Sequence, residues 1–223
     1  MSLIIFMESV KYLVGIDEVG RGPIAGPVTV CAFLVKNDDR TLTTVGKFLL
    51  RDKRGGFKDS KRLSKNQREI CFAEIKKARN GKIKCGFDFA VSFVDHNTID
   101  RKGIVEAINL AIERSLHKLT LAPSETRVFL DGGLKAPNEF KNQKTIIKGD
   151  QKIPVIALAS IVAKVSRDRK MHLLAKKYQD YGFENHVGYG TTAHYTAIKK
   201  LGLCEIHRRT FLKQEKCEII ISN

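Results

Sequence analysis

Apolar residues recur along this chain with two spacings, one typical of strands and the other of helices. The clearest strand pattern lies between residues 83 and 93, where apolar side chains alternate with other residues without a miss. Its members are Ile83, Cys85, Phe87, Phe89, Val91 and Phe93. This alternation predicts a strand with one buried face. Shorter apolar runs predict strands over residues 12–16, 28–35, 127–130 and 145–148.

Helical spacing and end signals predict further elements. Ser64 and Gln67 have the spacing of a capping box, so we expect a helix from residue 64 to about residue 80, ended by Gly81. Apolar stripes predict helices over 103–119 and 192–201, and a long helix over 153–181 that is apolar early and basic late. The polar and basic residues 37–56 are predicted to form a loop.

Strands and helices in this order predict an α/β fold with a mixed central sheet flanked by helices. We expect residues 12–16 and 28–35 to pair antiparallel through the loop between them, which excludes a plain Rossmann unit. The length of 223 residues suits one domain. Our interpretation is a single domain over residues 1–223, with 182–223 as a small helical C-terminal appendage packed on it.

Two adjacent carboxylates and a glycine-rich loop follow the first predicted strand. Asp17 and Glu18 come directly after the apolar run, and Gly20, Arg21 and Gly22 follow them. Paired carboxylates offer hard oxygen ligands suited to Mg²⁺ or Mn²⁺. Glycines let backbone N–H groups approach a ligand closely. A lone pair of acids is more often part of a surface turn, but the order of strand, acids, loop and second strand favours a site.

The charge of the chain favours a polyanionic partner. The net charge is +16 and the sequence pI is about 9.7. Residues 36–84 hold 16 Lys/Arg against 6 Asp/Glu, and residues 164–216 hold 12 against 5. Basic flanks around an acidic centre fit a metal-dependent enzyme that acts on nucleic acid. Solubility or attraction to a membrane surface is the alternative explanation of this charge.

The cysteines and the apolar runs bear on the cellular setting. The five cysteines are scattered, without Cys-x-x-Cys spacing, which favours a reducing compartment and no zinc site. The longest apolar run, around residues 153–163, is far too short to span a membrane. No basic segment precedes the apolar residues 3–7, as a secretory signal would require. We expect a cytoplasmic monomer without a membrane partner.

The run from Asp17 to Val28 closely resembles the signature of type 2 ribonucleases H, the bacterial ribonuclease HII family. Its residues are Asp17-Glu18-Val19-Gly20-Arg21-Gly22-Pro23 followed by Ala25-Gly26-Pro27-Val28. Later motifs appear in the family's order, so the resemblance covers about residues 12–211. It implies a ribonuclease H-like fold and a metal-dependent endonuclease that hydrolyses the RNA strand of RNA–DNA hybrids.

The resemblance also implies the catalytic carboxylates. The acids that match the family's metal ligands are Asp17, Glu18, Asp131 and Asp150. Converging carboxylates repel one another unless cations lie between them, and two Mg²⁺ or Mn²⁺ ions would serve phosphodiester hydrolysis. Asp168 is also in a family-like motif. It lies well inside the long predicted helix, more than about 20 Å along the axis from Asp150. We therefore interpret Asp168 as structural, paired with Arg167, Arg169 or a loop.

Substrate-binding residues are carried over in the same way. In the family, the backbone at the positions of Gly20, Arg21 and Gly22 reads the ribonucleotide 2′-hydroxyl, and the tyrosine at the position of Tyr189 stacks on the following deoxyribose. On its own, Tyr189 would more often be a half-buried turn residue. Four further residues are expected to meet phosphates: Ser60, Lys61, Arg62 and Lys164. For Lys164 a solvated helix face is an equal alternative.

These residues predict cleavage 5′ to a ribonucleotide at an RNA–DNA junction, which leaves 3′-hydroxyl and 5′-phosphate ends. The expected partners are RNA–DNA hybrids and duplex DNA that contains ribonucleotides. One alternative is a type 3-like ribonuclease H that needs longer RNA tracts. The other is a catalytically inert nucleic-acid-binding protein.

Overall fold

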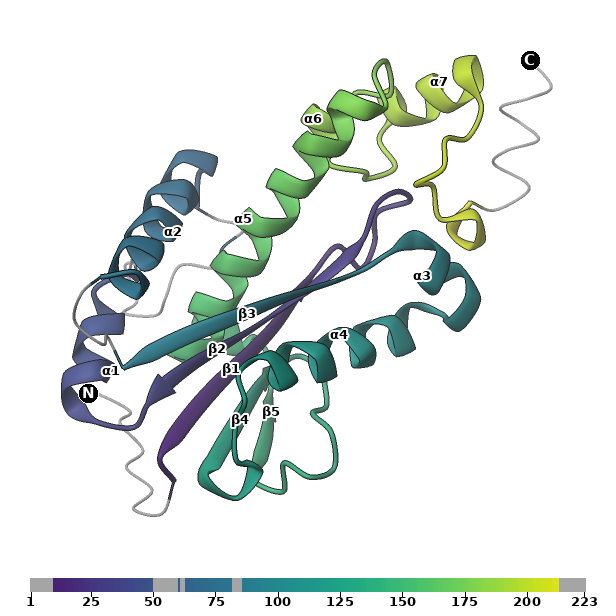
Figure 1. Cartoon of the computed structure of the whole chain (residues 1–223). Coiled ribbons are helices and arrows are strands. Elements are labelled where there is room, and N and C mark those ends of the chain that lie inside the picture. The colour runs from purple at the N-terminus through teal and green to yellow at the C-terminus, as the bar shows by residue number, and fades with distance from the viewer. Residues whose placement is uncertain (1–9, 50–59, 61–62, 82–85, 213–223) are drawn as a thin grey trace.

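A mixed five-stranded sheet forms the centre of the molecule (Figure 1). The structure is a computed structural model, and it describes residues 10–49, 60, 63–81 and 86–212. The strands are β1 (Tyr12–Val19), β2 (Val28–Lys36), β3 (Phe87–Val94), β4 (Thr126–Asp131) and β5 (Gln143–Ile146). Their order in the sheet is β3-β2-β1-β4-β5. β2 pairs antiparallel with β1 and β3, while β1, β4 and β5 run parallel. The predicted mixed sheet is confirmed.

The first strand is longer than the apolar run predicted. β1 was expected to end at Ile16, but its antiparallel pairing continues through Asp17↔Cys31 and Glu18↔Val30 to Val19↔Thr29. Backbone pairing with β2 keeps the chain extended regardless of side-chain polarity. The two acids therefore lie inside the end of a hydrogen-bonded strand, which fixes their backbone more firmly than a loop would.

Helices cover both faces of the sheet. α5 (Pro154–Lys177) packs on β1 and β2, with α2 (Lys65–Arg79) beside it, and α4 (Ile104–Lys118) covers the opposite face (Figure 1). The approach of α5 to β1 is close because Gly15 has no side chain. A Cβ on Gly15 would lie 2.2 Å from the carbonyl carbon of Val155.

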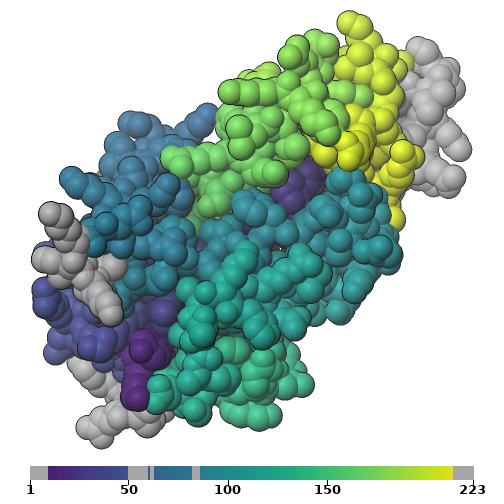
Figure 2. Space-filling model, in the orientation of Figure 1, coloured from purple at the N-terminus to yellow at the C-terminus, as the bar shows by residue number. Residues whose placement is uncertain are grey.

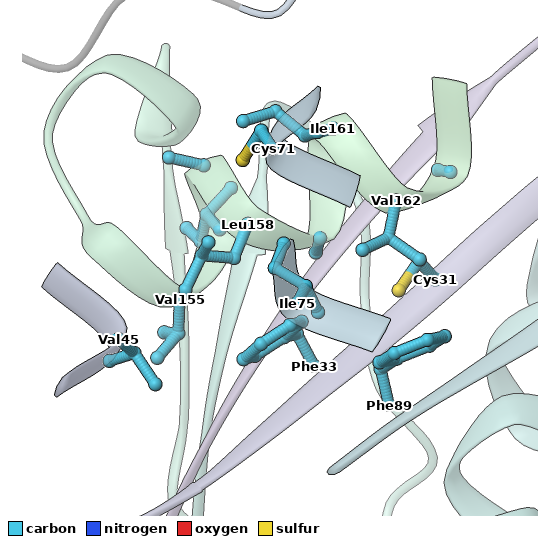
Figure 3. Packing of buried hydrophobic residues seen from close by; sticks show 14 of the residues in the cluster. Cys31, Phe33, Val45, Cys71, Ile75, Phe89, Val155, Leu158, Ile161 and Val162 are labelled. Atoms are coloured by element: carbon cyan, nitrogen blue, oxygen red, sulfur yellow. The ribbon is translucent and has the colours of Figure 1, made fainter. Parts of the chain in front are cut away.

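Each face of the sheet has its own apolar core. On the α5 side, Phe33 and Phe89 of the sheet pack with Ile75 of α2 and with Leu158 and Val162 of α5 (Figure 3). On the α4 side, the core includes side chains of β1, β2, β4 and α4 together with Phe140. Burial on both faces explains why β2 is apolar almost throughout.

Most of the predicted helices are confirmed. α2 starts with Ser64 as its N-cap, and the capping box with Gln67 is present. α4 buries the predicted stripe, and α7 (Thr192–Leu201) has the predicted bounds. α5 begins at Pro154, which suits a first helical position, and it ends at Lys177 rather than near residue 181.

Other predictions were wrong in detail. The expected loop over residues 37–56 contains α1 (Asp39–Gly46), whose N-cap Asp38 accepts from Thr41 N–H and whose Val45 is fully buried. α3 (His96–Lys102) and α6 (Phe183–His186) were not expected. β5 begins two residues before the predicted strand and ends at Ile146. The predicted buried face does not extend to Phe93, which is 38 % exposed and lies outside the core on the α5 side, whereas Val94 on the other face belongs to the core on the α4 side.

The segment after α5 packs as a separate apolar cluster. Phe183, Ile198 and Ile206 meet Met171 of α5 and Ala25 of the loop between β1 and β2. We call this group, with its other buried members Ile24 and Tyr181, the C-terminal cluster. The division into one catalytic domain and an appendage at 182–223 stays a prediction. Within the described residues, no helix has the length and apolarity that a membrane crossing needs.

Candidate active site

Three of the predicted acids lie at one end of the sheet. The parallel register pairs Ile16 with Leu130, so Asp17 and Asp131 follow on neighbouring strands. Glu18 comes next on β1. Asp150 lies in a short 3₁₀ turn, Gly149–Gln151, beyond β5. The Asp131 carboxylate accepts a 2.6 Å hydrogen bond from Gly149 N–H, which joins the end of β4 to the turn that carries Asp150.

Burial and like charge act together on these acids. Asp17 is 7 % exposed, and its pKa is raised well above the usual value by burial, then by the charges of Glu18 and Asp131. A hydrogen bond with Ser160 opposes this rise. Burial also raises the pKa of Glu18, while Arg21, whose Nη1 lies 3.5 Å from Glu18 Oε1, lowers it. The site therefore holds carboxylates that lack enough positive charge to balance them.

The described acidic side chains are not arranged as a set of metal ligands. Among the described residues, no three His, Cys, Asp or Glu side chains are grouped so that they could hold a metal ion. The backbone nevertheless brings Asp17, Glu18 and Asp131 to one end of the sheet, where their charges act on one another.

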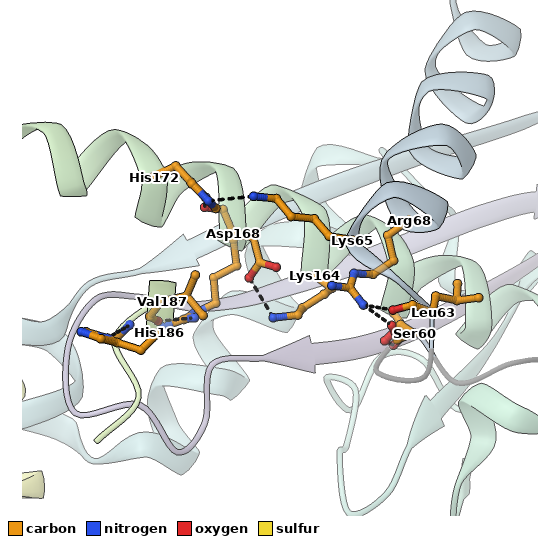
Figure 4. Close-up of polar contacts among 12 residues, drawn as sticks. Ser60, Leu63, Lys65, Arg68, Lys164, Asp168, His172, His186 and Val187 are labelled. Carbon is orange, nitrogen blue, oxygen red and sulfur yellow. Dashed lines mark hydrogen bonds and ion pairs between the residues drawn. The ribbon is translucent and has the colours of Figure 1, made fainter. Parts of the chain in front are cut away.

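A pair of serines supports Asp17. Ser160 of α5 interacts with the Asp17 carboxylate, and its Oγ lies 2.8 Å from Ser60 Oγ. Arg68 of α2 donates to the carbonyl oxygens of Ser60 and Leu63 (Figure 4). Ser60 is buried, so its hydroxyl faces Ser160 rather than solvent. The phosphate contact expected of Ser60 stays a prediction, and Lys61 and Arg62 lie outside the described residues.

Lys164 and Asp168 form an ion pair on α5 (Figure 4). Lys164 Nζ lies 2.8 Å from Asp168 Oδ1, and both side chains are mostly buried. The solvated helix face considered for Lys164 is therefore wrong. Of the partners expected for Asp168, Arg169 pairs with Glu69 instead, and Arg167 donates to backbone carbonyls although the charge of Asp168 acts on it.

The loop between β1 and β2 is fixed by segments distant in sequence. Ile24 N–H donates to Gly188 O at 2.9 Å, and Gly26 N–H donates to Ile206 O at 2.9 Å. Gly20 has φ +90°, and a Cβ there would lie 2.2 Å from Nε of Arg167, so glycine is required. In Figure 2 the purple of this part of the chain shows as a small patch between green, yellow and teal segments.

Tyr189 lies beside this loop. A Cβ on Gly22 would lie 4.0 Å from Cε1 of Tyr189, and the tyrosine is 41 % exposed. The Gly-Arg-Gly loop and the predicted stacking residue thus share one surface, next to the strand end that carries Asp17 and Glu18.

Two buried histidines hold the backbone of Tyr189. His194 Nδ1 lies 2.8 Å from Tyr189 O, so it carries the proton and donates. His207 Nδ1 accepts from Cys204 N–H at 2.9 Å, so its Nε2 donates to His194 Nε2 at 3.1 Å. Burial lowers the pKa of His194 to about 4, and burial also lowers the pKa of His207. Both rings are neutral near pH 7.

Comparison with protein families shows the family to which this chain belongs. The family model described as Ribonuclease HII matches residues 14–214. The chain belongs to the ribonuclease HII family. It is therefore a ribonuclease H, an endoribonuclease that hydrolyses phosphodiester bonds, and the resemblance of the loop signature is confirmed.

Curated ribonucleases HII align over most of their length. The chain is 41 % identical to ribonuclease HII of Caldicellulosiruptor bescii over 206 residues, which cover 92 % of this chain and 89 % of the relative. It is 43 % identical to ribonuclease HII of Endomicrobium trichonymphae over 197 residues, which cover 88 % and 83 %.

Solved structures share the fold. The crystal structure of ribonuclease H2 from Pyrococcus horikoshii OT3 matches with a TM-score of 0.66 at 24 % identity, over 94 % of this chain and 96 % of that one. Bst-RNase HIII in complex with Mn²⁺ matches with a TM-score of 0.68 at 20 % identity, over 99 % and 73 %. The expected ribonuclease H-like fold is confirmed.

Sequence reasoning missed three supporting residues of this ribonuclease HII site. Ser160 lies in an apolar run and carries no sequence signal beyond a hydroxyl on the helix face that meets β1. Arg167 was interpreted as a possible partner of Asp168, and Arg208 was given no role. Both arginines lie in basic stretches, where sequence does not separate a buried cation from a solvated one.

Proposed function

We propose that this ribonuclease H cuts 5′ to a ribonucleotide at an RNA–DNA junction, including a single ribonucleotide in duplex DNA, and leaves 3′-hydroxyl and 5′-phosphate ends. The observation that carries the proposal is the position of Tyr189 beside Gly22. It brings a surface for stacking on a sugar next to a loop of backbone donors, both close to the acids of β1.

The carboxylates fit divalent cations. Asp17 is buried beside the negative charges of Glu18 and Asp131. A bound cation would offset both the cost of burying the Asp17 charge and the repulsion among the three carboxylates. Asp17, Glu18, Asp131 and Asp150 would hold Mg²⁺ or Mn²⁺. When bound, two such ions supply an activated water and stabilise the leaving 3′-oxygen.

Ribonucleotide recognition would use the loop and Tyr189 together. The backbone N–H groups of Gly20, Arg21 and Gly22 are the candidates for contact with the 2′-hydroxyl, which distinguishes RNA from DNA at one position. Tyr189 would stack on the following deoxyribose. His194 supports this role because it fixes the carbonyl of Tyr189 and so limits where the ring can lie.

Phosphate contacts would position the duplex. Ser60, Lys61, Arg62 and Lys164 are the proposed contacts, and the charge of +16 suits a polyanion. Lys164 already pairs with Asp168, so a phosphate would have to share or displace that carboxylate. A monomer in the cytoplasm stays our expectation for the cellular form, with Cys31, Cys71 and Cys204 as free thiols.

The test is cleavage of a DNA duplex with one embedded ribonucleotide, beside an RNA–DNA hybrid, with Mg²⁺, Mn²⁺ or chelator. We expect a metal-dependent cut 5′ to the lone ribonucleotide. Cleavage of the hybrid alone would replace the proposal with a type 3-like preference for RNA tracts. Binding without cleavage of either substrate would favour the inert nucleic-acid-binding alternative.

A further inference from the structure

Two arginines are buried without a carboxylate partner. Arg167 and Arg208 are both 0 % exposed, and neither belongs to an ion pair in the described part of the chain. A buried charge is costly unless other groups satisfy it. Here backbone carbonyl oxygens satisfy both guanidinium groups, and most of these carbonyls belong to the loop between β1 and β2.

The two arginines donate to different carbonyl oxygens of that loop. Arg208 donates from Nη2 to Gly20 O at 2.7 Å, from Nη1 to Arg21 O at 3.1 Å and from Nε to Gly26 O at 2.9 Å. Arg167 donates to three other carbonyls, those of Pro27, Val187 and Ala25. Only Arg208 bonds to the Gly-Arg-Gly segment.

The hydrogen bonds to Gly20 O and Arg21 O also determine the direction in which the N–H groups of the following residues point. In a trans peptide the C=O of one residue and the N–H of the next point in opposite directions, and the described residues contain no cis peptide. Because Gly20 O and Arg21 O point toward Arg208, the N–H groups of Arg21 and Gly22 point away from it.

These two N–H groups have no partner within the described residues. Arg21 and Gly22 are exposed, and no hydrogen bond from either backbone nitrogen is present there. Two adjacent, outward-facing donors remain beside Tyr189. A guanidinium behind the peptide carbonyls also polarises the peptides, which strengthens their N–H groups as donors to an oxygen.

We propose that Arg208 is a positioning residue for ribonucleotide recognition: it holds the carbonyls of Gly20 and Arg21 so that the N–H groups of Arg21 and Gly22 face the substrate 2′-hydroxyl. The inference rests on the proposed junction function. Arg208 touches no substrate, and its effect passes through the backbone.

The test compares Arg208→Lys with Arg167→Lys. Lysine keeps the charge, but its single nitrogen cannot replace three donors spread over a planar group. Each change removes a buried guanidinium that bonds to the loop between β1 and β2. Only Arg208→Lys leaves the carbonyls of Gly20 and Arg21 without that donor. The two measurements are KM and kcat on duplex DNA with one ribonucleotide, and the inhibition constant of the all-DNA duplex of the same sequence.

We expect Arg208→Lys to raise KM for the ribonucleotide substrate about ten-fold while the inhibition constant of the all-DNA duplex stays within two-fold. Arg167→Lys should change both constants in parallel. Equal changes of both constants in Arg208→Lys would show a general structural role and overturn the inference, as would no change in either.

Two further measurements keep the test decisive. Arg208→Gln removes the unpaired buried charge, which lessens the cost of folding, and should show the same selective rise in KM if the lysine variant fails to fold. The wild type is assayed first on the lone ribonucleotide. If it fails to cut there, the proposed function falls, whereas a competent wild type with unselective variants rejects only the role of Arg208.

Discussion

The Asp131 carboxylate is hydrogen-bonded to the backbone of Gly149, in the short turn that follows β5. Its carboxylate oxygen accepts from Gly149 N–H at 2.6 Å while its charge acts on Asp17 and Glu18. A neutral amide of the same shape can keep a place in the fold, but it gives up the charge on which the proposed metal binding depends.

Asp131→Asn should therefore retain the fold and reduce cleavage of an RNA–DNA hybrid ~100-fold or more. The rate is measured in Mg²⁺, with the far-ultraviolet circular dichroism spectrum as the check on folding. Asp88→Asn is the matched control, because Asp88 is half-exposed at the start of β3 and pairs with Arg79. A fully active Asp131→Asn enzyme would reject the site.

Ser160 lies between Asp17 and Ser60, and it interacts with both side chains. Ser160→Ala removes a hydroxyl that favours the ionised form of Asp17. A hydrogen bond to a charged group contributes about 1.5–3 kcal/mol, so the Mg²⁺ concentration for half-maximal activity should rise about ten-fold or more. Ser60→Ala, one hydrogen bond further away, should cause a smaller rise. Equal effects of the two changes would contradict a direct role of Ser160.

At the scale of single residues, sequence identified charge better than burial. The apolar run before Asp17 and Glu18 placed these acids at the end of a strand, and the resemblance to the family implied Asp131; their roles as metal ligands stay a prediction. Arg208 was not, because it stands beside Arg209 in the chain, and only the folded structure separates the buried guanidinium from its exposed neighbour.

Among the elements, the contact of α5 with β1 is the one on which the site depends most. Gly15 lies two residues before Asp17, and Ser160 follows Val155 by little more than one helical turn. The same interface therefore sets the distance between the strand that carries the acids and the helix that supports them.

Gly15→Ala should push these elements apart. The added Cβ would lie 2.2 Å from both the carbonyl carbon and the oxygen of Val155 and 2.4 Å from Ile156 N, all backbone atoms that cannot rotate away. We expect a loss of about 3 kcal/mol or more in the free energy of unfolding, measured with urea, and reduced activity. Gly133→Ala is the control, since nothing lies within 4 Å of its added Cβ. A loss below about 0.5 kcal/mol in Gly15→Ala would contradict this packing.

Predictability of the elements followed the strength of local signals. The capping box located the start of α2, and the long apolar stripe located α4. α1 was missed because its few buried residues stand among polar ones over barely two turns. The alternation of β3 predicted which face Phe93 lies on but not its exposure, because how far the packed helices extend along a strand depends on tertiary contacts.

On the scale of the whole molecule, the segment after α5 packs against the loop between β1 and β2 and contains two buried, neutral histidines, His194 and His207. His194 has a pKa of about 4 in the folded protein, against about 6.5 in an unfolded chain. As the pH falls from about 6.5 to 4, the unfolded chain takes up a proton that folded His194 does not. His194 therefore makes folding less favourable in acid.

His194→Asn keeps an amide donor for Tyr189 O but does not titrate. Asp17 and Glu18, whose pKa values are raised, act in the opposite direction over part of this range, because they bind protons first in the folded state. The comparison of variant and wild type isolates the histidine. Urea unfolding at pH 7, 6 and 5 should show a shallower loss of stability in His194→Asn. A steeper loss in the variant would contradict a neutral His194.

The whole fold was only partly predictable. The apolar pattern indicated a mixed sheet with helices, and the loop between the first two strands indicated their antiparallel pairing. The order β3-β2-β1-β4-β5 depends on contacts between distant segments, and local patterns do not encode it. The same limit applies to the meeting of the segment after α5 with the loop between β1 and β2.

That meeting has a consequence for how the protein is made. Arg208 bonds to the carbonyl of Gly20 across 188 residues of sequence. At a synthesis rate of about 5–20 residues per second, the loop is synthesised roughly 10–40 seconds before the arginine that anchors it. A nascent or truncated chain that stops short of Arg208 would carry all four carboxylates without the guanidinium that bonds to Gly20 O and Arg21 O. On the proposed role of Arg208, such a chain would lack the oriented N–H groups of the loop.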